Sequence, residues 1–260
     1  MAHRNLLYLL SLKELRTRYK KSILGWSWSL LNPLSQMLIF SVIFLYVFVA
    51  TPPVGDPSGL KNFPLYFLCG LVPFNFFAIS ASVAMGAVQG GSSLIKKVQF
   101  PHEHLVFSVI IAQFVTMLVE LALLTVALLI AGNMVLPWFP VLLLVMGLLV
   151  MFTTGVALAL AAANVFFHDV NYLWGIFSQL LFYATPVIWN PANPAIPQML
   201  RNVAIYGPTG SFITTFHTVL YDLRMPTAAR LVQLVLMSFA TFFLGAWVFA
   251  KLSPRFAEEM

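Results

Sequence analysis

The chain has 260 residues, of which 60% are hydrophobic and 8% are charged, and its net charge is +6. Because a soluble globular domain carries about 25% charged residues, this composition excludes an ordinary soluble protein and predicts that lipid surrounds most of the chain. The positive charges stand at the ends of apolar runs, which favours membrane topology signals over a surface for nucleic acid. The single cysteine, Cys69, excludes an intrachain disulfide.

Residues 1–31 form a basic segment ahead of the first apolar run. On a helical wheel its apolar residues share one narrow stripe: Tyr8, Leu12, Leu15, Tyr19, Ile23 and Trp26. Basic residues cover the other faces: Lys13, Arg16, Arg18, Lys20 and Lys21. This pattern predicts an amphipathic helix at the membrane interface. Two roles remain open for the basic residues, Tyr19 and Trp26: a topology anchor, or an entrance for a substrate with an anionic lipid head.

Six later stretches are long and apolar enough to span a bilayer, which takes about 20 residues. They run over residues 33–50, 63–88, 105–131, 139–166, 172–189 and 231–250. Between the last two lies a segment rich in proline and glycine, residues 190–230. Its apolar pieces, residues 196–206 and 209–221, are too short to cross, which predicts a pair of short helices that act as a gate or vestibule element.

These elements predict an all-α membrane protein with one membrane domain over residues 1–260. Its parts are the interfacial helix (1–31), five spans (32–189), the short helical hairpin (190–230), and the sixth span with its tail (231–260). Lys and Arg favour a cytoplasmic amino terminus, because ten of them then lie inside and four outside. An even number of spans puts both termini in the cytoplasm and the hairpin outside.

Two short polar connections carry candidate contacts. After the second span, Leu94, Ile95 and Val98 form the apolar side of about two helical turns that Pro101 ends, with Lys96 and Lys97 beside them. So short a helix needs a partner surface. It is either a positively charged cytoplasmic loop or a helix that docks on an ATPase. Between the fourth and fifth spans, Asp169 follows His168 and is either a helix cap or a second cytoplasmic contact.

Four stretches in this order resemble the permeases of the polysaccharide and polyol-phosphate ABC exporter family. They read KELRTRYKKSILG (residues 13–25), FLCGLVPFNFF (67–77), LIKKVQFPHEHL (94–105), and FFHDV (166–170) followed by FYATPVIW (182–189). Trp26 and a Leu-Asn-Pro ending at Pro33 follow the first stretch, as in that family. The chain departs from the family pattern at His104 and Leu105, and His168 stands in place of the usual Arg.

The resemblance implies the membrane subunit of an exporter of polyprenyl-diphosphate-linked polysaccharide in the bacterial inner (plasma) membrane. It implies two copies of this chain and two cytoplasmic ATPase chains. The sequence has no Gly-Lys pair and therefore no phosphate-binding loop, so no cofactor is expected here, and ATP and Mg²⁺ belong to the partner. The implied ATPase-coupling residues are Leu94, Ile95, Lys96, Lys97, Val98, Phe100, Pro101, Glu103 and Asp169.

A path for the glycan is expected along the first and fifth spans. Gln179, Tyr183 and Pro186 share one face of the fifth span, and Phe40 and Phe44 share one face of the first. An amide and aromatic lining suits the passage of sugars. A stripe of Phe also suits packing or lipid contact, and that alternative remains open.

An alternative function is an ion-coupled secondary transporter or a lipid flippase without an ATPase. Such proteins carry ionisable relay groups inside the membrane, and Glu120 in the third span is the one clear example here, with Thr116 one turn earlier. A carboxyl group packed at a helix contact explains Glu120 equally well. A membrane enzyme is excluded by the spacing of the acidic residues, which puts no two close together outside the carboxyl-terminal tail.

Overall fold

The computed structural model describes residues 2–18, 25–47, 53–91, 100–191, 193 and 196–259. Within these ranges it does not describe the side chains of residues 2–6, 16–18, 26, 29, 257 and 258. The described part is helical, and its one β-type contact is an isolated bridge between Val54 and Lys61. The prediction of an all-α protein is confirmed for this part.

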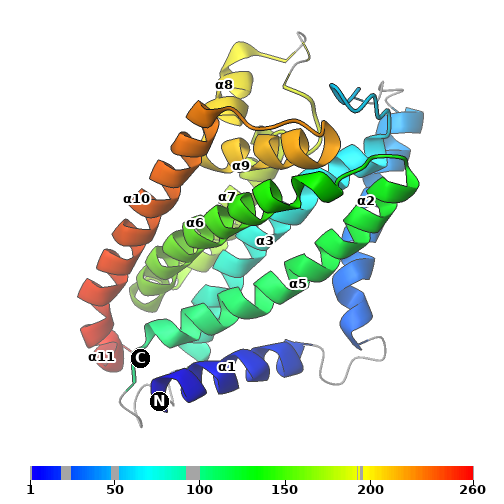
Figure 1. Cartoon of the computed structure of the whole chain (residues 1–260). Helices are drawn as coiled ribbons and strands as arrows, with labels where there is room; N and C mark the ends of the chain where they lie inside the picture. Colours follow the sequence, from blue (N-terminus) through cyan, green and yellow to red (C-terminus); the bar gives the residue numbers. More distant parts are fainter. Residues whose placement is uncertain are drawn as a thin grey trace.

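The helices form a bundle with two distinct ends (Figure 1). Both chain termini lie at one end, with α1 and α11; we call it the terminal end. The short helices α8 and α9 lie at the other, which we call the hairpin end. The α-helices are α1 (Ala2–Arg18), α2 (Trp28–Val42), α3 (Phe63–Gly90), α5 (Glu103–Ile130), α6 (Phe139–Phe166), α7 (Asp169–Ala184), α8 (Gln198–Tyr206), α9 (Pro208–Phe216), α10 (Ala228–Leu252) and α11 (Phe256–Glu259).

Among the described residues, five helical segments are long and apolar enough to cross a membrane. They are Leu30–Val47, Phe63–Gly90, Glu103–Ile130, Leu136–Phe166 and Ala228–Arg255. They match the first four predicted spans and the sixth, so the protein is a multi-pass membrane protein. The predicted pair of short helices also exists, as α8 and α9.

The predicted fifth span is shorter than expected. Helix α7 has 16 residues and ends at Ala184, because Thr185 precedes a proline and takes an extended backbone with φ −96° and ψ 155°. Sixteen residues of helix cover about 24 Å, whereas the hydrocarbon core is about 30 Å thick. The count of six spans is therefore not confirmed, since α7 alone does not reach across.

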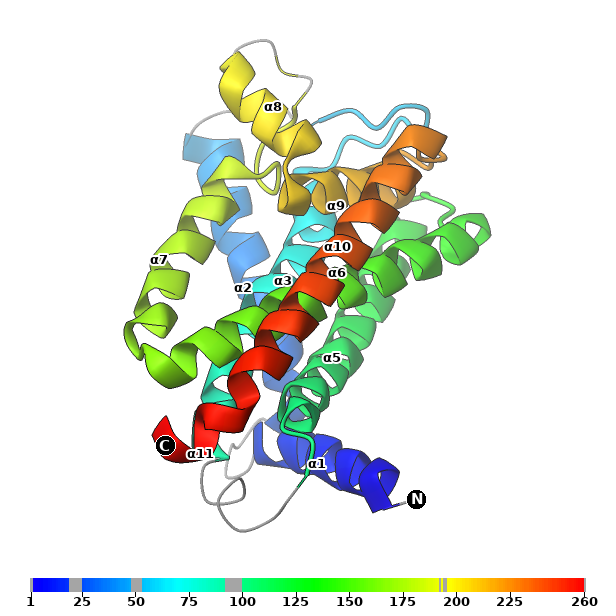
Figure 2. The ribbon, with the colours of Figure 1, turned by 90° about the vertical axis from the view of Figure 1, so that its left-hand side faces the viewer.

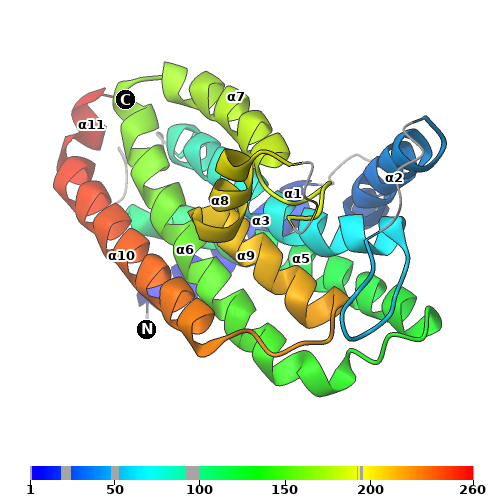
Figure 3. The ribbon, with the colours of Figure 1, turned by 90° about the horizontal axis from the view of Figure 1, so that it is seen from above.

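Helix α3 lies at the centre of the bundle and α2 and α10 at its edge (Figure 3). In the most apolar 18-residue stretch of each span, 72% of the residues are buried in α3, 6% in the segment that contains α2, and 17% in α10. Helix α10 touches α6 through two glycines, Gly155 and Gly245. A Cβ atom on Gly155 would lie 2.6 Å from the backbone nitrogen of Phe242, so a side chain there would push the helices apart.

We predict that Gly155→Ala separates α6 from α10 and lowers the free energy of unfolding by about 1–3 kcal/mol. Thermal unfolding of the purified protein in detergent measures this loss. Gly147→Ala is the matched control on the same helix, because its Cβ would have no neighbour within 4 Å. That variant should be at least as stable as the wild type, because alanine favours a helix more than glycine does. Equal loss in both variants would contradict the close helix contact.

Candidate functional site

At the hairpin end, α9 continues into a π-helical turn, His217–Tyr221. This segment packs on α3 and α6 and lies beside them when the bundle is seen from above (Figure 3). Its apolar side chains, including Phe212, Phe216 and Leu220, are buried. This π turn ends the helix and directs three polar residues, His217, Tyr221 and Asp222, toward the chain around it.

The His217 ring fits against α3 because Gly70 has no side chain. A Cβ atom on Gly70 would lie 2.9 Å from the His217 Nε2 atom and 3.1 Å from the Val187 Cα atom. The imidazole stacks on the Tyr66 ring with 4.0 Å between centroids. Its Nε2 atom lies 3.0 Å from the Tyr66 carbonyl oxygen, which can only accept, so the Nε2 atom carries the proton. Burial lowers the pKa of His217 to about 4, and the ring is neutral at pH 7.

The Tyr221 hydroxyl holds the loop that precedes α3. It lies 2.7 Å from the Pro53 carbonyl oxygen and 2.9 Å from that of Leu60, and accepts a hydrogen bond from the Asn62 amide at 3.0 Å. Burial raises the pKa of this hydroxyl, which keeps it protonated. The Asn133 amide nitrogen donates to the Leu220 carbonyl at 2.8 Å. Side chains therefore satisfy backbone groups where the π turn ends.

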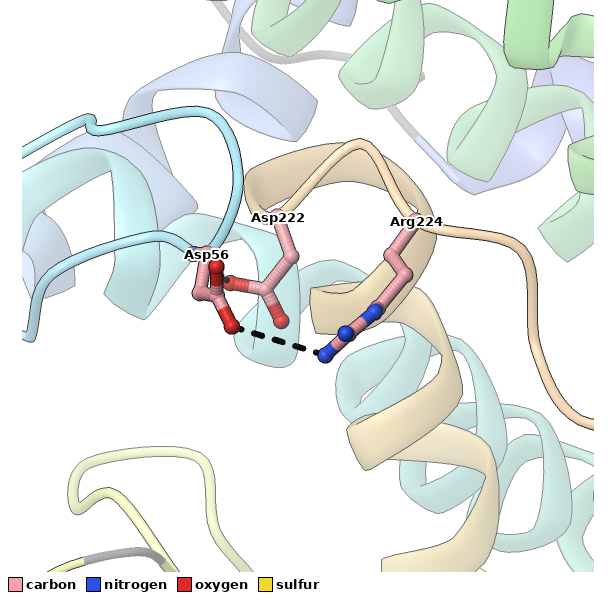
Figure 4. Close-up of polar contacts among 3 residues, drawn as sticks. All are labelled: Asp56, Asp222 and Arg224. Atoms are coloured by element: carbon pink, nitrogen blue, oxygen red, sulfur yellow. Dashed lines mark hydrogen bonds and ion pairs between the residues drawn. The ribbon is translucent and has the colours of Figure 1, made fainter.

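Asp222 follows the π turn and meets the same loop (Figure 4). Its Oδ1 atom accepts a hydrogen bond from the Asp56 backbone amide at 3.3 Å. Burial raises the pKa of Asp222, and the hydrogen bond from Asp56 opposes that shift. The Asp56 carboxylate pairs with Arg224 at 3.5 Å; both side chains are largely exposed, at 81% and 64%, so this ion pair adds little stability.

These groups surround a cavity of about 230 Å³. We call it the hairpin cavity. Its walls combine hydroxyl, amide, carboxylate and aromatic groups from the loop before α3, α3 itself, the turn after α7, α9 and the π turn. The lining residues are Pro53, Val54, Tyr66, Asn190, Pro191, Thr214, His217, Thr218, Tyr221 and Asp222.

The turn between α8 and α9 is tied to the start of α10. The Arg230 guanidinium donates to the Ile205 carbonyl oxygen, to the Ser211 hydroxyl at 3.0 Å, and to the Gln233 side-chain oxygen at 2.9 Å. The Gln233 amide in turn donates to the Ser211 hydroxyl at 3.1 Å. This cluster fixes both short helices to a long one.

At the terminal end, aromatic rings join the predicted coupling segments. Phe256 of α11 is fully buried; its ring centroid lies 6.0 Å from that of His102, 6.1 Å from Phe166 and 5.3 Å from Phe249. His102 also contacts the Phe100 ring at 5.5 Å. The start of α5 and the end of α6 therefore meet at one place, through the carboxyl-terminal segment.

Where the structure describes them, the predicted coupling residues lie at or just before the starts of α5 and α7. Phe100 is buried, and Pro101 and Glu103 are partly exposed at the start of α5. Asp169 is exposed at the start of α7, close in sequence to Phe166. The remaining predicted coupling residues lie outside the described residues: Leu94, Ile95, Lys96, Lys97 and Val98.

The basic segment forms α1, which lies across the terminal end (Figure 1) and packs on α5. Leu10 and Ser11 face the protein, whereas Tyr8 of the predicted apolar stripe is 67% exposed. Of the predicted headgroup residues, Lys13 is exposed. For the others the structure describes only the backbone (Arg16, Arg18, Trp26), or they lie outside the described residues (Tyr19, Lys20, Lys21).

The residues predicted to line a path are separated in the structure. Gln179 and Tyr183 are exposed on α7, whereas Pro186 is buried in the turn that follows. Phe40 and Phe44 are partly buried and pack against the core of the bundle. The Phe40 ring lies 4.9 Å from Phe67 and 5.7 Å from Phe182, and the Phe44 ring lies 5.1 Å from Phe63, all between centroids.

Glu120 is partly buried where α5 meets α2 and α3. The space beside it, lined by Pro33, Leu34 and Val72 among others, is only about 10 Å³, which is at the lower limit for one water molecule. The Thr116 hydroxyl donates to the Ala112 carbonyl at 3.2 Å within the same helix. These surroundings favour a Glu120 carboxyl group packed at a helix contact over a proton relay along a channel.

None of the ten residues that line the hairpin cavity is among the candidates predicted from the sequence. They come from segments far apart in the chain, and each looks ordinary in its own segment. The one local signal is the spacing of His217 and Tyr221, four residues apart with Asp222 next to them, inside an apolar piece too short to cross the membrane. That spacing places both rings on one helix face.

We predict that the stability of the protein falls as the pH drops from about 6.5 to about 4, partly through His217. The unfolded chain takes up a proton near pH 6.5, whereas the folded ring stays neutral to about pH 4. The unfolded state therefore binds more protons in this window, and the loss reaches about 3 kcal/mol. Unfolding midpoints of the wild type and of His217→Gln at pH 7.5 and 4.5 measure this loss of stability.

The variant should show a smaller pH dependence than the wild type, because Asp222 and other groups titrate in both proteins and cancel in the comparison. His168→Gln, at an exposed position in the turn before α7, serves as the control and should keep the wild-type slope. Identical slopes for the wild type and His217→Gln would mean that the buried ring does not titrate in this way.

Curated proteins similar to this chain cover almost its whole length. It is 30% identical over 263 residues to the O-antigen export system permease protein RfbA of Myxococcus xanthus, covering 99% of this chain and 96% of that protein. It is 29% identical over 259 residues to the protein of the same name from Klebsiella pneumoniae, covering 98% and 94%. It is 23% identical over 237 residues to the polysialic acid transport protein KpsM of Escherichia coli, covering 91% and 89%.

The family model for ABC-2 type transporters matches residues 5–221. The match begins in α1, includes the bundle through α7, and ends at Tyr221, the last residue of the π turn. The short helices α8 and α9, the π turn and the start of α5 lie inside it. The chain therefore belongs to the family of ABC-2 type transporters.

Proposed function

We propose that this chain moves a polysaccharide, carried on a polyprenyl diphosphate, across the bacterial inner membrane as the membrane subunit of an ATP-driven exporter. The observation that supports this most is the end-to-end similarity to permeases named for O-antigen export and polysialic acid transport. Members of this family are membrane subunits, and a separate partner chain hydrolyses the ATP. The chain is accordingly a transport subunit and not an enzyme.

In this proposal the terminal end faces the cytoplasm and the hairpin end faces outward. Ten of the 14 Lys and Arg residues then lie inside. Helix α7 runs from the terminal end toward the hairpin end (Figure 2). Residues 185–190 would complete the crossing that α7 begins, which makes six crossings and leaves both termini inside. Helix α1 would lie in the interface, with Lys13 and its basic neighbours near lipid headgroups.

A second copy of the chain would complete the path. Tyr172, Ile176, Gln179 and Tyr183 share one face of α7, and all four are exposed. An exposed amide is costly against hydrocarbon, and this supports a polar surrounding for Gln179. Helices α2 and α7 lie on the same side of the bundle (Figures 2 and 3). A two-fold dimer through this side, the commonest symmetry of oligomers, would put Gln179 and Tyr183 beside a glycan that passes between the copies.

Two ATPase chains, which hold the ATP and Mg²⁺, would dock at the terminal end. The buried ring of Phe256 links the start of α5, which follows the proposed docking helix, to the end of α6. Motion of the ATPase at Lys96, Lys97 and their neighbours would then reach α5, α6 and α10 together. The exposed Asp169 lies at the same end and offers a second contact.

We predict that export requires the ATPase partner and does not require Glu120. Glu120→Gln should export glycan within about twofold of the wild type, because the carboxyl packs at a helix contact and carries no proton relay. A partner ATPase without its phosphate-binding lysine should abolish export. Glycan delivery into membrane vesicles that contain both chains measures both effects. Export that survives the loss of ATP hydrolysis but stops in Glu120→Gln would instead support an ion-coupled transporter.

We predict that replacing Leu94, Ile95 and Val98 together by Asp reduces ATPase association at least tenfold, because three charges would replace the apolar side of the docking helix. Copurification of the ATPase with the permease measures association, and membrane fractionation checks insertion. The matched control replaces three exposed apolar residues at the hairpin end, Met134, Leu136 and Met225, by Asp. Unchanged association in the first variant would mean that the loop is only a topology anchor.

A further inference from the structure

We propose that the hairpin cavity is a binding site for one sugar ring without negative charge. This inference rests on the proposed function and adds a specificity to it: the site would hold a neutral or amino sugar of the glycan at the outer end of the permease. The size, the hydrogen-bonding groups and the charge of the cavity each support this ligand class.

The cavity of about 230 Å³ lies just below the range of about 300–1,000 Å³ typical for drug-sized ligands. Its size therefore suits one sugar ring. Its walls come from five parts of the chain that α3 and the π turn hold together. The site exists without a ligand, so binding costs little ordering of the protein.

The polar groups of the cavity mostly accept hydrogen bonds. The Thr214 hydroxyl donates to the Gly210 carbonyl at 2.9 Å, and the Thr218 hydroxyl donates to the Thr214 carbonyl at 2.8 Å. Their protons are used within the helix, while their oxygen lone pairs remain able to accept. The Asp222 carboxylate accepts as well. A ligand rich in donors fits such a wall, and sugar hydroxyls and ammonium groups are donors.

The aromatic walls have their hydrogen-bond donors already engaged. The Tyr66 hydroxyl donates to the Trp189 carbonyl at 3.0 Å, the Tyr221 hydroxyl lies 2.7 Å from the Pro53 carbonyl, and His217 pairs with the Tyr66 carbonyl. These side chains therefore offer a ligand carbon surface and hydrogen-bond acceptors, among them the Nδ1 atom of the neutral His217 ring. A sugar ring has apolar C–H groups that pack on such surface and hydroxyls that reach the acceptors.

The charge of the cavity selects among sugars. Asp222 is the one charged residue of the ten that line it. The nearby Arg224 pairs with Asp56 at 3.5 Å and is not part of the wall (Figure 4). Asp56, Asp222 and Arg224 together carry a net charge of −1, so an acidic sugar would meet excess negative charge at this wall. At a separation of about 4 Å in a watery surrounding, that repulsion weakens binding about fivefold.

The test compares methyl glucoside with methyl glucuronide, which have the same ring and differ by one carboxylate. Saturation-transfer NMR with the purified full-length permease in lipid nanodiscs at pH 8 measures both affinities. We expect saturable binding of the glucoside and about fivefold weaker binding of the glucuronide. Asp222→Asn should remove this difference, since the amide keeps the contact with the Asp56 backbone but has no charge. Glu259→Gln is the control and should preserve the difference, because it also removes one carboxylate but lies exposed in α11 at the terminal end, away from the cavity.

A second variant, Thr218→Phe, fills the cavity and should abolish glucoside binding while the thermal unfolding midpoint stays near that of the wild type. Unchanged binding in this variant, absent binding in the wild type, or equal affinities for the two glycosides would each overturn the inference. The assay needs neither the ATPase nor transport, so such a failure leaves the proposed exporter intact. A permease that binds glucoside as expected but exports no glycan with its ATPase would overturn the exporter and keep the site.

Discussion

The close contact of the π turn with α3 is the constraint on which the hairpin end depends. A helix that stops inside a membrane protein leaves backbone groups that lipid cannot satisfy. Here Asn133 and Ser58 bind the carbonyls of Leu220 and Tyr221, and the neutral His217 ring lies in the space that Gly70 leaves open. Any side chain at Gly70 would displace that ring and, with it, the packing that closes the hairpin cavity.

Helix α10 connects the two ends of the bundle. At its start, Arg230 and Gln233 hold the turn between α8 and α9. Near its end, Phe249 packs on Phe256, which also contacts His102 before α5 and Phe166 at the end of α6. Between these points α10 lies against α6 through two glycines, so the helices fit too closely for independent sliding. Movement imposed at the terminal end would therefore be transmitted to the hairpin end.

The two ends also differ in chemistry, in a way that suits an exporter. The terminal end carries α1, with the exposed Lys13, and the segment where an ATPase is proposed to dock. The hairpin end carries a cavity with acceptor groups and one carboxylate, Asp222. Between them the exposed face of α7 presents Gln179 and Tyr183. In the proposed exporter, a polyprenyl-linked glycan would meet the basic groups of the terminal end first and the proposed sugar site last.

The sequence by itself determined the all-helical membrane fold, the position of five spans, and the two short helices, because apolar length and the placement of proline and glycine act locally. The same local signals, together with the ordered motifs near residues 13–25 and 94–105, pointed to the transporter family. Local signals overestimated the fifth span, which Pro186 cuts short. Only the tertiary structure decided which residues form a site. Tyr66 and Asp222 lie far apart in sequence and become neighbours of one cavity only because Gly70 lets the π turn pack against α3.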